Sequence, residues 1–123
     1  MKEIKFRAYD LEKNKMFYDV PEVIVADQGG NWSRMQYTGL KDKNGKEIYE
    51  GDIVLDHGYR GVVKYGSLER LKFHGVFYLD LNEGGGTGGD VMFDRDLNLE
   101  VLGNIYEKPE LLKKESIFHL KDF

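Results

Sequence analysis

Two glycine-containing turn signals divide residues 35–54 into short runs in which apolar and polar residues alternate. Asn44 and Gly45 can both adopt positive φ angles at little steric cost, which predicts a two-residue type I′ turn between antiparallel strands. Gly51 and Asp52 then predict a second corner before the next apolar run. Twenty residues therefore encode a strand, a turn, a return strand and a corner, a pattern typical of β-sheet proteins.

Similar short runs occur along the rest of the chain. We predict strands over residues 4–10, 16–18, 32–40, 48–49, 53–55, 61–66, 71–81, 91–93 and 99–106. Two glycines inside these runs, Gly75 and Gly103, predict a bulge and a kink that bend the sheet. Many short strands separated by turn residues are typical of an all-β barrel or roll.

The predicted fold is therefore mainly β. The number of strands over residues 49–106 fits an SH3-like barrel, and residues 1–35 are expected to form additional N-terminal hairpins packed on it. Pro109 can start a short C-terminal helix that continues to Lys114. The tail over residues 113–123 has only weak helical character.

Size and composition limit the class of protein. The chain has 123 residues, which fits one domain over residues 1–123. It contains no cysteine, which excludes disulfides, thiolate nucleophiles and cysteine-bound zinc. The first residues form no apolar run, and no segment approaches the roughly 20 apolar residues of a membrane-spanning helix, so we expect a cytoplasmic protein. The net charge of −4 weighs against a protein that coats nucleic-acid phosphates.

Three longer motifs resemble the YopX family, which comprises small proteins encoded by bacteriophages and prophages. The motifs are residues 4–10, residues 35–54, and residues 99–107 together with 109–112. The resemblance implies an SH3-like barrel and a phage or prophage origin. It implies no reaction, and it assigns no functional residue. The glycine-rich residues 84–89 and the tail match no motif of the family.

No catalytic or cofactor-binding pattern stands out. Residues 84–89 satisfy the glycine spacing of a dinucleotide-binding loop, but a strand pattern follows them where that loop requires a helix. The three histidines lack the short spacings of zinc sites. An acidic cluster could serve a metal-dependent hydrolase, although a solvated loop explains the same residues better. The cluster comprises Asp90, Asp94, Asp96 and Glu100. We expect no catalytic residue, no cofactor and no metal site, and hence no enzyme.

Binding is the function that we expect. The leading hypothesis is a phage accessory protein that contacts a protein partner, with sheet edges that could also support a homo-oligomer. The alternative is nucleic-acid binding, because two aromatic–basic pairs are of the kind that stacks nucleobases. These pairs form the candidate binding surface; they are Trp32 with Arg34, and Tyr59 with Arg60.

Overall fold

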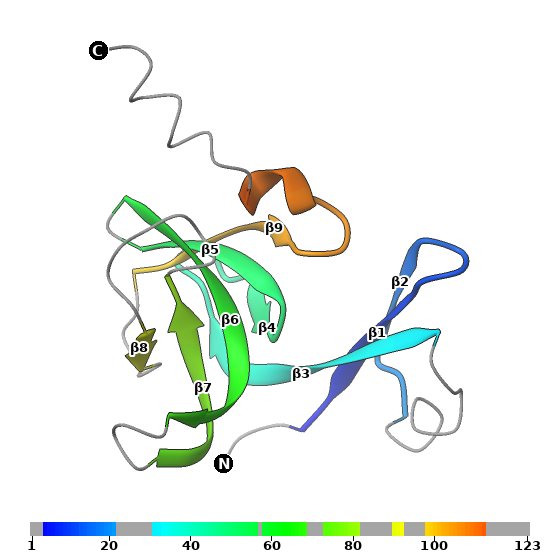
Figure 1. Cartoon of the computed structure of the whole chain (residues 1–123), viewed down its shortest axis with the longest axis horizontal. Helices are drawn as coiled ribbons and strands as arrows, with labels where there is room; N and C mark the ends of the chain where they lie inside the picture. Colours follow the sequence, from blue (N-terminus) through cyan, green and yellow to red (C-terminus); the bar gives the residue numbers. More distant parts are fainter. Residues whose placement is uncertain are drawn as a thin grey trace.

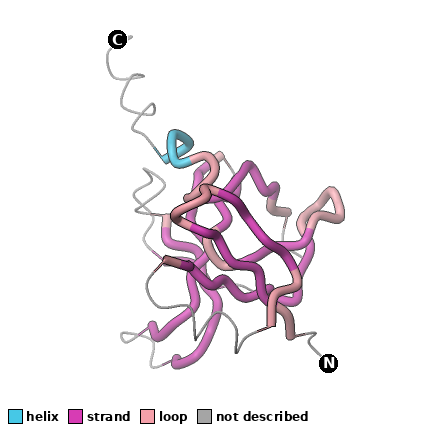
Figure 2. The backbone as a smooth tube through the Cα atoms, turned by 90° about the vertical axis from the view of Figure 1, so that its right-hand side faces the viewer, coloured by secondary structure: helices cyan, strands magenta, loops and turns pink. Residues whose placement is uncertain are grey.

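The computed structural model describes residues 4–21, 31–56, 58–68, 73–81, 90–92 and 98–112. Within these ranges the elements are β1 (Phe6–Asp10), β2 (Lys15–Tyr18), β3 (Trp32–Lys41), β4 (Glu47–Tyr49), β5 (Asp52–Asp56), β6 (Tyr59–Leu68), β7 (Phe73–Asp80), β8 (Asp90–Met92), β9 (Glu100–Asn104) and the 3-10 helix η2 (Pro109–Leu112). Strands make up most of the described chain, and η2 is its one short helical piece (Figure 2). The prediction of a mainly β fold is confirmed.

The strands form two antiparallel sheets. One has the order β2-β1-β3-β4, and the other has the order β8-β7-β6-β5-β9. The long strand β3 pairs with β1 over Trp32–Gln36 and with β4 from Tyr37 onwards. It therefore runs from the β1–β2 hairpin across to the curled five-stranded sheet (Figure 1), and it crosses the boundary that the sequence placed at residue 35.

Both sheets contribute to the main core. The core cluster comprises Ile48, Val54, Val63, Phe77, Leu79, Leu81 and Leu99. Ile48 comes from β4 of the smaller sheet, while Val54, Val63 and Leu79 come from three strands of the larger one. Fully burying an aliphatic side chain of this size stabilises a fold by about 1.5–3 kcal/mol. The smaller sheet is therefore held against the larger one by shared apolar contacts.

The turn after β3 differs from the type I′ turn that the sequence predicts. Gly45 has φ +83°, but Asn44 does not have a positive φ. The Gly45 N–H donates to the Asp42 carbonyl at 3.0 Å, and the Asp42 N–H donates to the Lys46 carbonyl at 2.7 Å. This pattern is a three-residue loop in which a left-handed glycine follows an ordinary turn. The prediction of a type I′ turn is wrong because a side chain, that of Asp42, organises the loop.

Asp42 also ties this loop to the edge of the five-stranded sheet. Its Oδ1 accepts from the N–H groups of Asn44 and Lys46, both at 2.8 Å, and its Oδ2 accepts from the Val101 N–H at 2.9 Å. Burial acts to raise the pKa of the Asp42 carboxyl, but these three N–H donors outweigh it and hold the pKa below its ordinary value of 3.8. The loop therefore covers part of the exposed edge of β9.

Other glycine predictions are confirmed. Gly51 has φ +90° at the corner before β5. Opposite β6, strand β7 carries one extra residue between Phe73 and Val76, the region of Gly75 where the sequence predicts a bulge. The pairing of β9 with β5 is likewise irregular beside Gly103.

The predicted C-terminal helix is shorter than expected. It is a single 3-10 turn over Pro109–Leu112, in which the Leu111 N–H donates to the Lys108 carbonyl at 3.0 Å. This hydrogen bond joins residues three apart, which is the pattern of a 3-10 helix. Residues from 113 onwards lie outside the described part of the chain.

Candidate functional site

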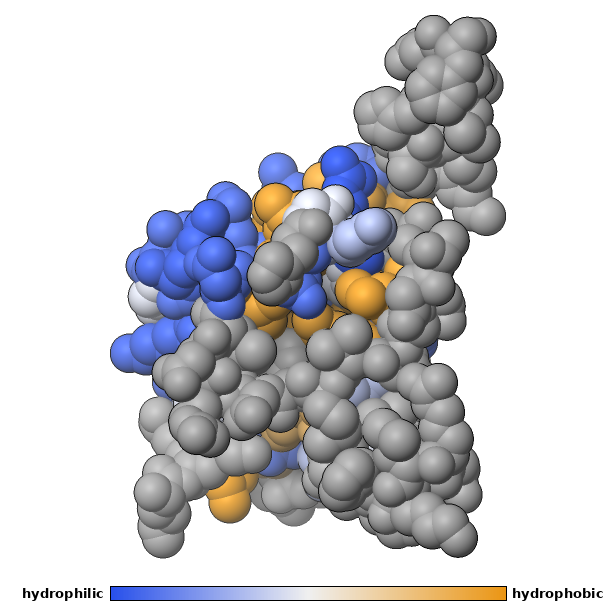
Figure 3. Space-filling model, turned by 90° about the vertical axis from the view of Figure 1, so that its left-hand side faces the viewer, coloured by the Kyte–Doolittle hydropathy of each residue, from blue (hydrophilic) through white to orange (hydrophobic). Residues whose placement is uncertain are grey.

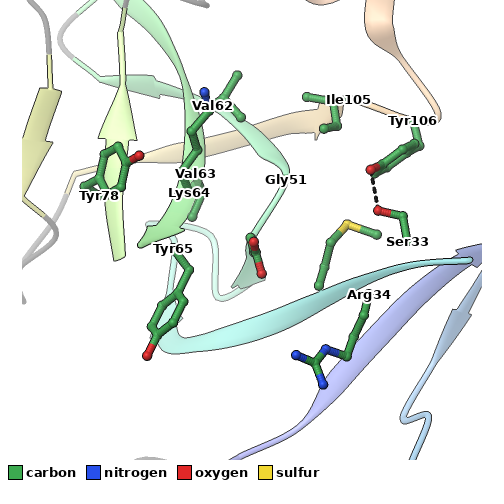
Figure 4. A pocket seen from close by; sticks show the side chains of 12 residues that line it. Ser33, Arg34, Gly51, Val62, Val63, Lys64, Tyr65, Tyr78, Ile105 and Tyr106 are labelled. Carbon is green, nitrogen blue, oxygen red and sulfur yellow. Dashed lines mark hydrogen bonds between the residues drawn. The ribbon is translucent and has the colours of Figure 1, made fainter. Parts of the chain in front are cut away.

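A cavity of about 300 Å³ lies between β3 and the curled five-stranded sheet, and we call it the interlayer cavity (Figure 4). It is lined by Ser33, Arg34, Met35, Glu50, Gly51, Val62, Val63, Lys64, Tyr65, Tyr78, Ile105 and Tyr106. These residues come from β3, from the corner before β5, from β6 and β7, and from the segment that follows β9. The cavity therefore exists only where both sheets meet.

Tyrosine side chains stand on both sides of the cavity. Tyr65 and Tyr78 stand on the side formed by β6 and β7, and Ser33 and Tyr106 lie opposite them (Figure 4). The hydroxyls of Ser33 and Tyr106 share a hydrogen bond. The ring of Tyr106 is stacked on that of Tyr9, with centroids 5.1 Å apart, so this side is held in place.

Tyr65 is the aromatic residue of the cavity that reaches furthest into solvent. It is 45% exposed, and its ring contacts that of Phe77 with centroids 4.7 Å apart. Phe77 belongs to the main core. One side of the Tyr65 ring is held by Phe77, and the rest of the side chain is exposed to solvent, as in aromatic anchors at protein interfaces.

Three charged residues line the same cavity. The Arg34 guanidinium lies over the ring of Phe6, at 4.9 Å from its centroid, and the Lys64 ammonium pairs with Asp80 at 2.8 Å. Glu50 is the carboxylic acid of the lining, and its Oε1 accepts from the Gln36 N–H at 3.3 Å. Burial raises the pKa of Glu50 above its ordinary value of 4.5, although the Gln36 N–H, Arg34 and Arg7 act to lower it.

This shift predicts a pH-dependent effect of the substitution Glu50→Gln. Because the folded-state pKa of Glu50 is raised, its contribution to stability is complete below the unfolded-state pKa and is lost as pH rises through the folded-state pKa. Glutamine does not ionise and keeps an acceptor for the Gln36 N–H. We therefore expect Glu50→Gln to be more stable than the natural chain at pH 7 and equally stable at pH 3, as measured by urea unfolding.

The matched control is Glu110→Gln, on the exposed first turn of η2. We expect it to change the free energy of unfolding by less than about 0.5 kcal/mol at either pH. A lower stability of Glu50→Gln at pH 7 would show that the ionised carboxylate stabilises the fold, which would contradict this prediction.

A buried ion pair joins the two sheets behind the cavity. The Arg7 guanidinium on β1 donates from Nη2 to Asp52 Oδ1 on β5 at 2.7 Å, and the two side chains are 3% and 2% exposed. Asp52 Oδ2 accepts from the Tyr49 N–H at 2.8 Å. Burial raises the pKa of Asp52, while the charge of Arg7 lowers it. The two acids beside Gly51 therefore differ in role, because Glu50 lines the cavity and Asp52 is held by Arg7.

The ring of Tyr49 completes this junction. The Arg7 guanidinium lies 4.6 Å from its centroid, and the rings of Tyr18 and Tyr37 pack against it. Burial raises the pKa of the Tyr49 hydroxyl to about 12, with a further contribution from the charge of Glu47. Tyr49 is therefore a neutral structural residue at physiological pH.

The structure does not bring the two predicted aromatic–basic pairs together. Trp32 and Arg34 lie on the first half of β3, whereas Tyr59 and Arg60 start β6, and these strand ends lie on opposite sides of the molecule (Figure 1). Of the four, Arg34 alone lines the interlayer cavity.

Three of the four residues make contacts within the fold, including Arg34 over the ring of Phe6. The Trp32 ring contacts that of Phe17, with centroids 5.4 Å apart, and Arg60 Nη1 donates to the Leu111 carbonyl at 2.6 Å. Tyr59 is 54% exposed. Arg60 therefore anchors η2, and Tyr59 is the free aromatic surface of its pair.

Sequence reasoning did not single out Tyr65, Tyr78 or Tyr106 as site residues. Tyr65 lies on β6, Tyr78 lies on the neighbouring strand β7, and Tyr106 follows β9. Each is one of eight tyrosines in an aromatic-rich chain. Strand pairing brings Tyr65 and Tyr78 together, since Lys64, the residue before Tyr65, stands opposite Tyr78 in the β6–β7 register.

The acidic cluster is only partly described. Asp94 and Asp96 lie outside the described residues, and Glu100 pairs with Lys43 at 3.7 Å. Among the residues that the structure describes, no group of three or more acidic or histidine side chains is placed to hold a metal ion. In the same ranges, no helix has the length and apolar character needed to cross a membrane.

The fold is similar to that of a solved structure, protein EF1440 from Enterococcus faecalis. The two chains are 24% identical and align with a TM-score of 0.50, covering 92% of this chain and 100% of the other. This similarity concerns the fold alone. A search of curated proteins gives no match.

The family comparison covers most of the residues that build the site. The sequence profile described as YopX protein matches residues 22–113, a range that contains β3 to β9 and η2. It includes the whole lining of the interlayer cavity. The chain belongs to the YopX family.

Proposed function

We propose that this protein is a non-enzymatic accessory protein of a phage or prophage that binds a protein partner in the bacterial cytoplasm. In this proposal the strands from β4 to β9 form an SH3-like barrel, a fold that commonly serves as a binding module. The observation that carries the proposal is the interlayer cavity with the exposed ring of Tyr65 at its side.

The lining of the cavity supports the binding of a partner side chain. Met35, Val62, Val63 and Ile105 provide apolar surface, and the tyrosine hydroxyls and Glu50 provide polar groups. Binding pockets typically combine an apolar lining with a few polar groups, and a volume of 300 Å³ is at the small end of their range. The cavity is therefore suited to one or two side chains of a protein segment.

The apolar lining of the cavity also supports this choice of site. On the side of the molecule shown in Figure 3, described hydrophilic residues gather in a block, and described apolar residues appear in several separate areas. The interlayer cavity gathers four apolar side chains, those of Met35, Val62, Val63 and Ile105. Protein interfaces concentrate their binding energy where aromatic and apolar groups are gathered.

Nucleic-acid binding is the second candidate, and the exposed ring of Tyr59 is the observation that favours it. It requires Tyr59 to act without Trp32 and Arg34, which lie at the other side of the molecule (Figure 1). The net charge of −4 disfavours long-range attraction to phosphates. A protein partner therefore remains the leading proposal.

The experiment is affinity capture of the tagged full chain from infected cells, with and without nuclease. A protein partner should be retained after nuclease treatment, whereas a nucleic-acid-dependent capture should be lost. Size-exclusion chromatography of the purified protein gives its oligomeric state in the same preparation.

We expect Tyr65→Ala to weaken binding of the captured partner at least tenfold, because truncation removes an aromatic anchor from the cavity. The matched control is Tyr59→Ala, at a similarly exposed tyrosine on the same strand that does not line the cavity. Isothermal titration calorimetry with the purified partner measures both. Loss of binding in Tyr59→Ala with retention in Tyr65→Ala would move the proposed site to the tip of the β5–β6 hairpin.

A further inference from the structure

A second cavity, of about 310 Å³, lies between the β1–β2 hairpin and the segment from β9 to η2, and we call it the Arg7 cavity. The lining residues that carry charge are Arg7, Lys46, Asp52, Glu107 and Lys108. The remaining wall includes the ring of Tyr18 and the backbone of β9. It shares no lining residue with the interlayer cavity.

The guanidinium of Arg7 has hydrogen-bonding capacity that the fold does not use. Arg7 is 2% exposed, and its hydrogen bonds leave from Nη2, to Asp52 Oδ1 at 2.7 Å and to the Glu50 carbonyl at 3.3 Å. Its buried Nε has no hydrogen-bond partner in the described structure. A guanidinium carries five N–H donors, and an unpartnered buried donor is costly. A ligand that brings an acceptor oxygen up to this buried cation would therefore satisfy one donor that the fold leaves unpaired, the Nε–H.

The charges around this cavity favour an anion. Three cationic side chains, Arg7, Lys46 and Lys108, line it together with two acids, Asp52 and Glu107, so the lining carries a formal charge of +1 in a chain of net charge −4. Both acids are already engaged by the protein. Asp52 accepts from Arg7 and from the Tyr49 N–H, and Glu107 Oε1 accepts from Asn104 Nδ2 at 2.7 Å.

The two lysines are exposed to solvent and line the cavity. Lys46 ends the loop organised by Asp42, and Lys108 follows β9, so two elements distant in sequence supply the cations. Arginine recognises carboxylate and phosphate oxygens through its planar arrangement of donors, and lysine adds a mobile point charge. The combination fits an oxyanion that enters from solvent towards Arg7.

We propose that the Arg7 cavity is a binding site for a small oxyanion, a carboxylate or a phosphate group. The anionic oxygens accept from the Arg7 guanidinium, and the ammonium groups of Lys46 and Lys108 neutralise the charge at the mouth. The apolar edge of Tyr18 provides room for the body of the molecule that carries the anionic group. This site is independent of the partner site proposed for the interlayer cavity.

The test is an NMR titration of the ¹⁵N-labelled full chain with sodium phosphate and, separately, with sodium acetate, each against sodium chloride at equal ionic strength. We expect saturable shifts of the Arg7 Nε–H signal and of the backbone amide of Gly103, which lines the cavity. Saturation by both anions assigns a general oxyanion site, and saturation by phosphate alone assigns a phosphate site. Shifts that do not saturate with either anion would overturn the proposal.

Variants of the exposed lysines identify the site without disturbing the buried ion pair. We expect Lys46→Gln and Lys108→Gln each to weaken binding about fivefold, since each removes one unit charge close to the anion. The matched control is Lys13→Gln, at an exposed lysine in the β1–β2 turn that does not line the cavity. Equal weakening in all three variants would mean that the anion senses only net charge, and the proposal would fail.

Discussion

Replacing Arg7 by methionine is expected to lower the free energy of unfolding by about 3–5 kcal/mol, because the substitution leaves Asp52 buried without its cation. Asp52 is 1% exposed, so water cannot replace the lost partner without opening the junction between the two sheets. The variant also loses the contact of the guanidinium with the ring of Tyr49. Urea unfolding followed by tyrosine and tryptophan fluorescence measures the effect.

The loss in Arg7→Met should also depend on pH. Burial raises the pKa of Asp52 and Arg7 lowers it, so removing Arg7 raises that pKa further. An acid with a raised folded-state pKa loses its stabilising contribution as pH rises. We therefore expect the deficit of Arg7→Met to be largest at neutral pH and smaller in acid, because protonation of Asp52 removes the unpaired buried charge.

Two further variants separate the buried charge from ordinary loss of packing. Arg7→Met combined with Asp52→Asn should be more stable than Arg7→Met alone, because no unpaired charge remains. Lys5, which directly precedes β1, forms a partly exposed ion pair with Glu47 on β4, and Lys5→Met should change stability by less than about 1 kcal/mol. Similar losses in Arg7→Met and Lys5→Met would contradict the role assigned to the buried pair.

Replacing Gly51 by alanine is expected to lower the free energy of unfolding by about 2–3 kcal/mol. Gly51 has φ +90°, a conformation in which a Cβ atom costs about 1–2 kcal/mol. The added Cβ would also lie 2.8 Å from the Sδ of Met35, which must move within the packed region between the sheets. Thermal and urea unfolding of the purified variant measure the loss.

The backbone of Gly51 explains why the chain cannot relax easily at this corner. Its N–H donates to the Val63 carbonyl at 2.7 Å, and its carbonyl accepts from the Ile105 N–H at 3.0 Å. A change of φ at Gly51 would therefore disturb hydrogen bonds to β6 and to the segment after β9. Both neighbours line the interlayer cavity, so the same substitution should weaken partner binding at that site.

Two glycines serve as graded controls. Gly45 also has a positive φ, but no atom lies within 4 Å of an added Cβ, so Gly45→Ala should cost only about 1 kcal/mol. Gly66 has open space and no positive φ, so Gly66→Ala should be close to neutral. If Gly51→Ala were no worse than Gly45→Ala, the contact with Met35 would contribute nothing measurable.

The local pattern of the sequence predicted most of the strands and corners. Alternating and short apolar runs located β1, β3, β5 and β6, and the glycine signals located the corner at Gly51 and the irregularities near Gly75 and Gly103. These features are local, because they depend on neighbouring side chains and on the φ angle of one residue. Pattern reasoning failed at the Asn44–Gly45 turn because the Asp42 carboxylate organises that loop. Its Oδ1 accepts from the N–H groups of Asn44 and Lys46, and its Oδ2 accepts from the Val101 N–H, 59 residues away.

The two sites could not be predicted in the same way. The interlayer cavity joins Ser33 on β3 to Tyr65 on β6 and Tyr106 after β9, and the Arg7 cavity joins β1 to β9. The sequence predicted a binding surface from two aromatic–basic pairs, yet the structure places the two pairs at opposite sides of the molecule.

The sequence by itself determined the mainly β class, the family and the glycine corner in residues 35–54. The tertiary structure alone decided that Glu50 lines a cavity while Asp52, two residues away, is buried against Arg7. The physical reason is that burial and charge pairing depend on which strands pack together. A Gly51 in the left-handed conformation sends its two acidic neighbours to different environments, but only the packing of β1 and β3 on the second sheet supplies those environments.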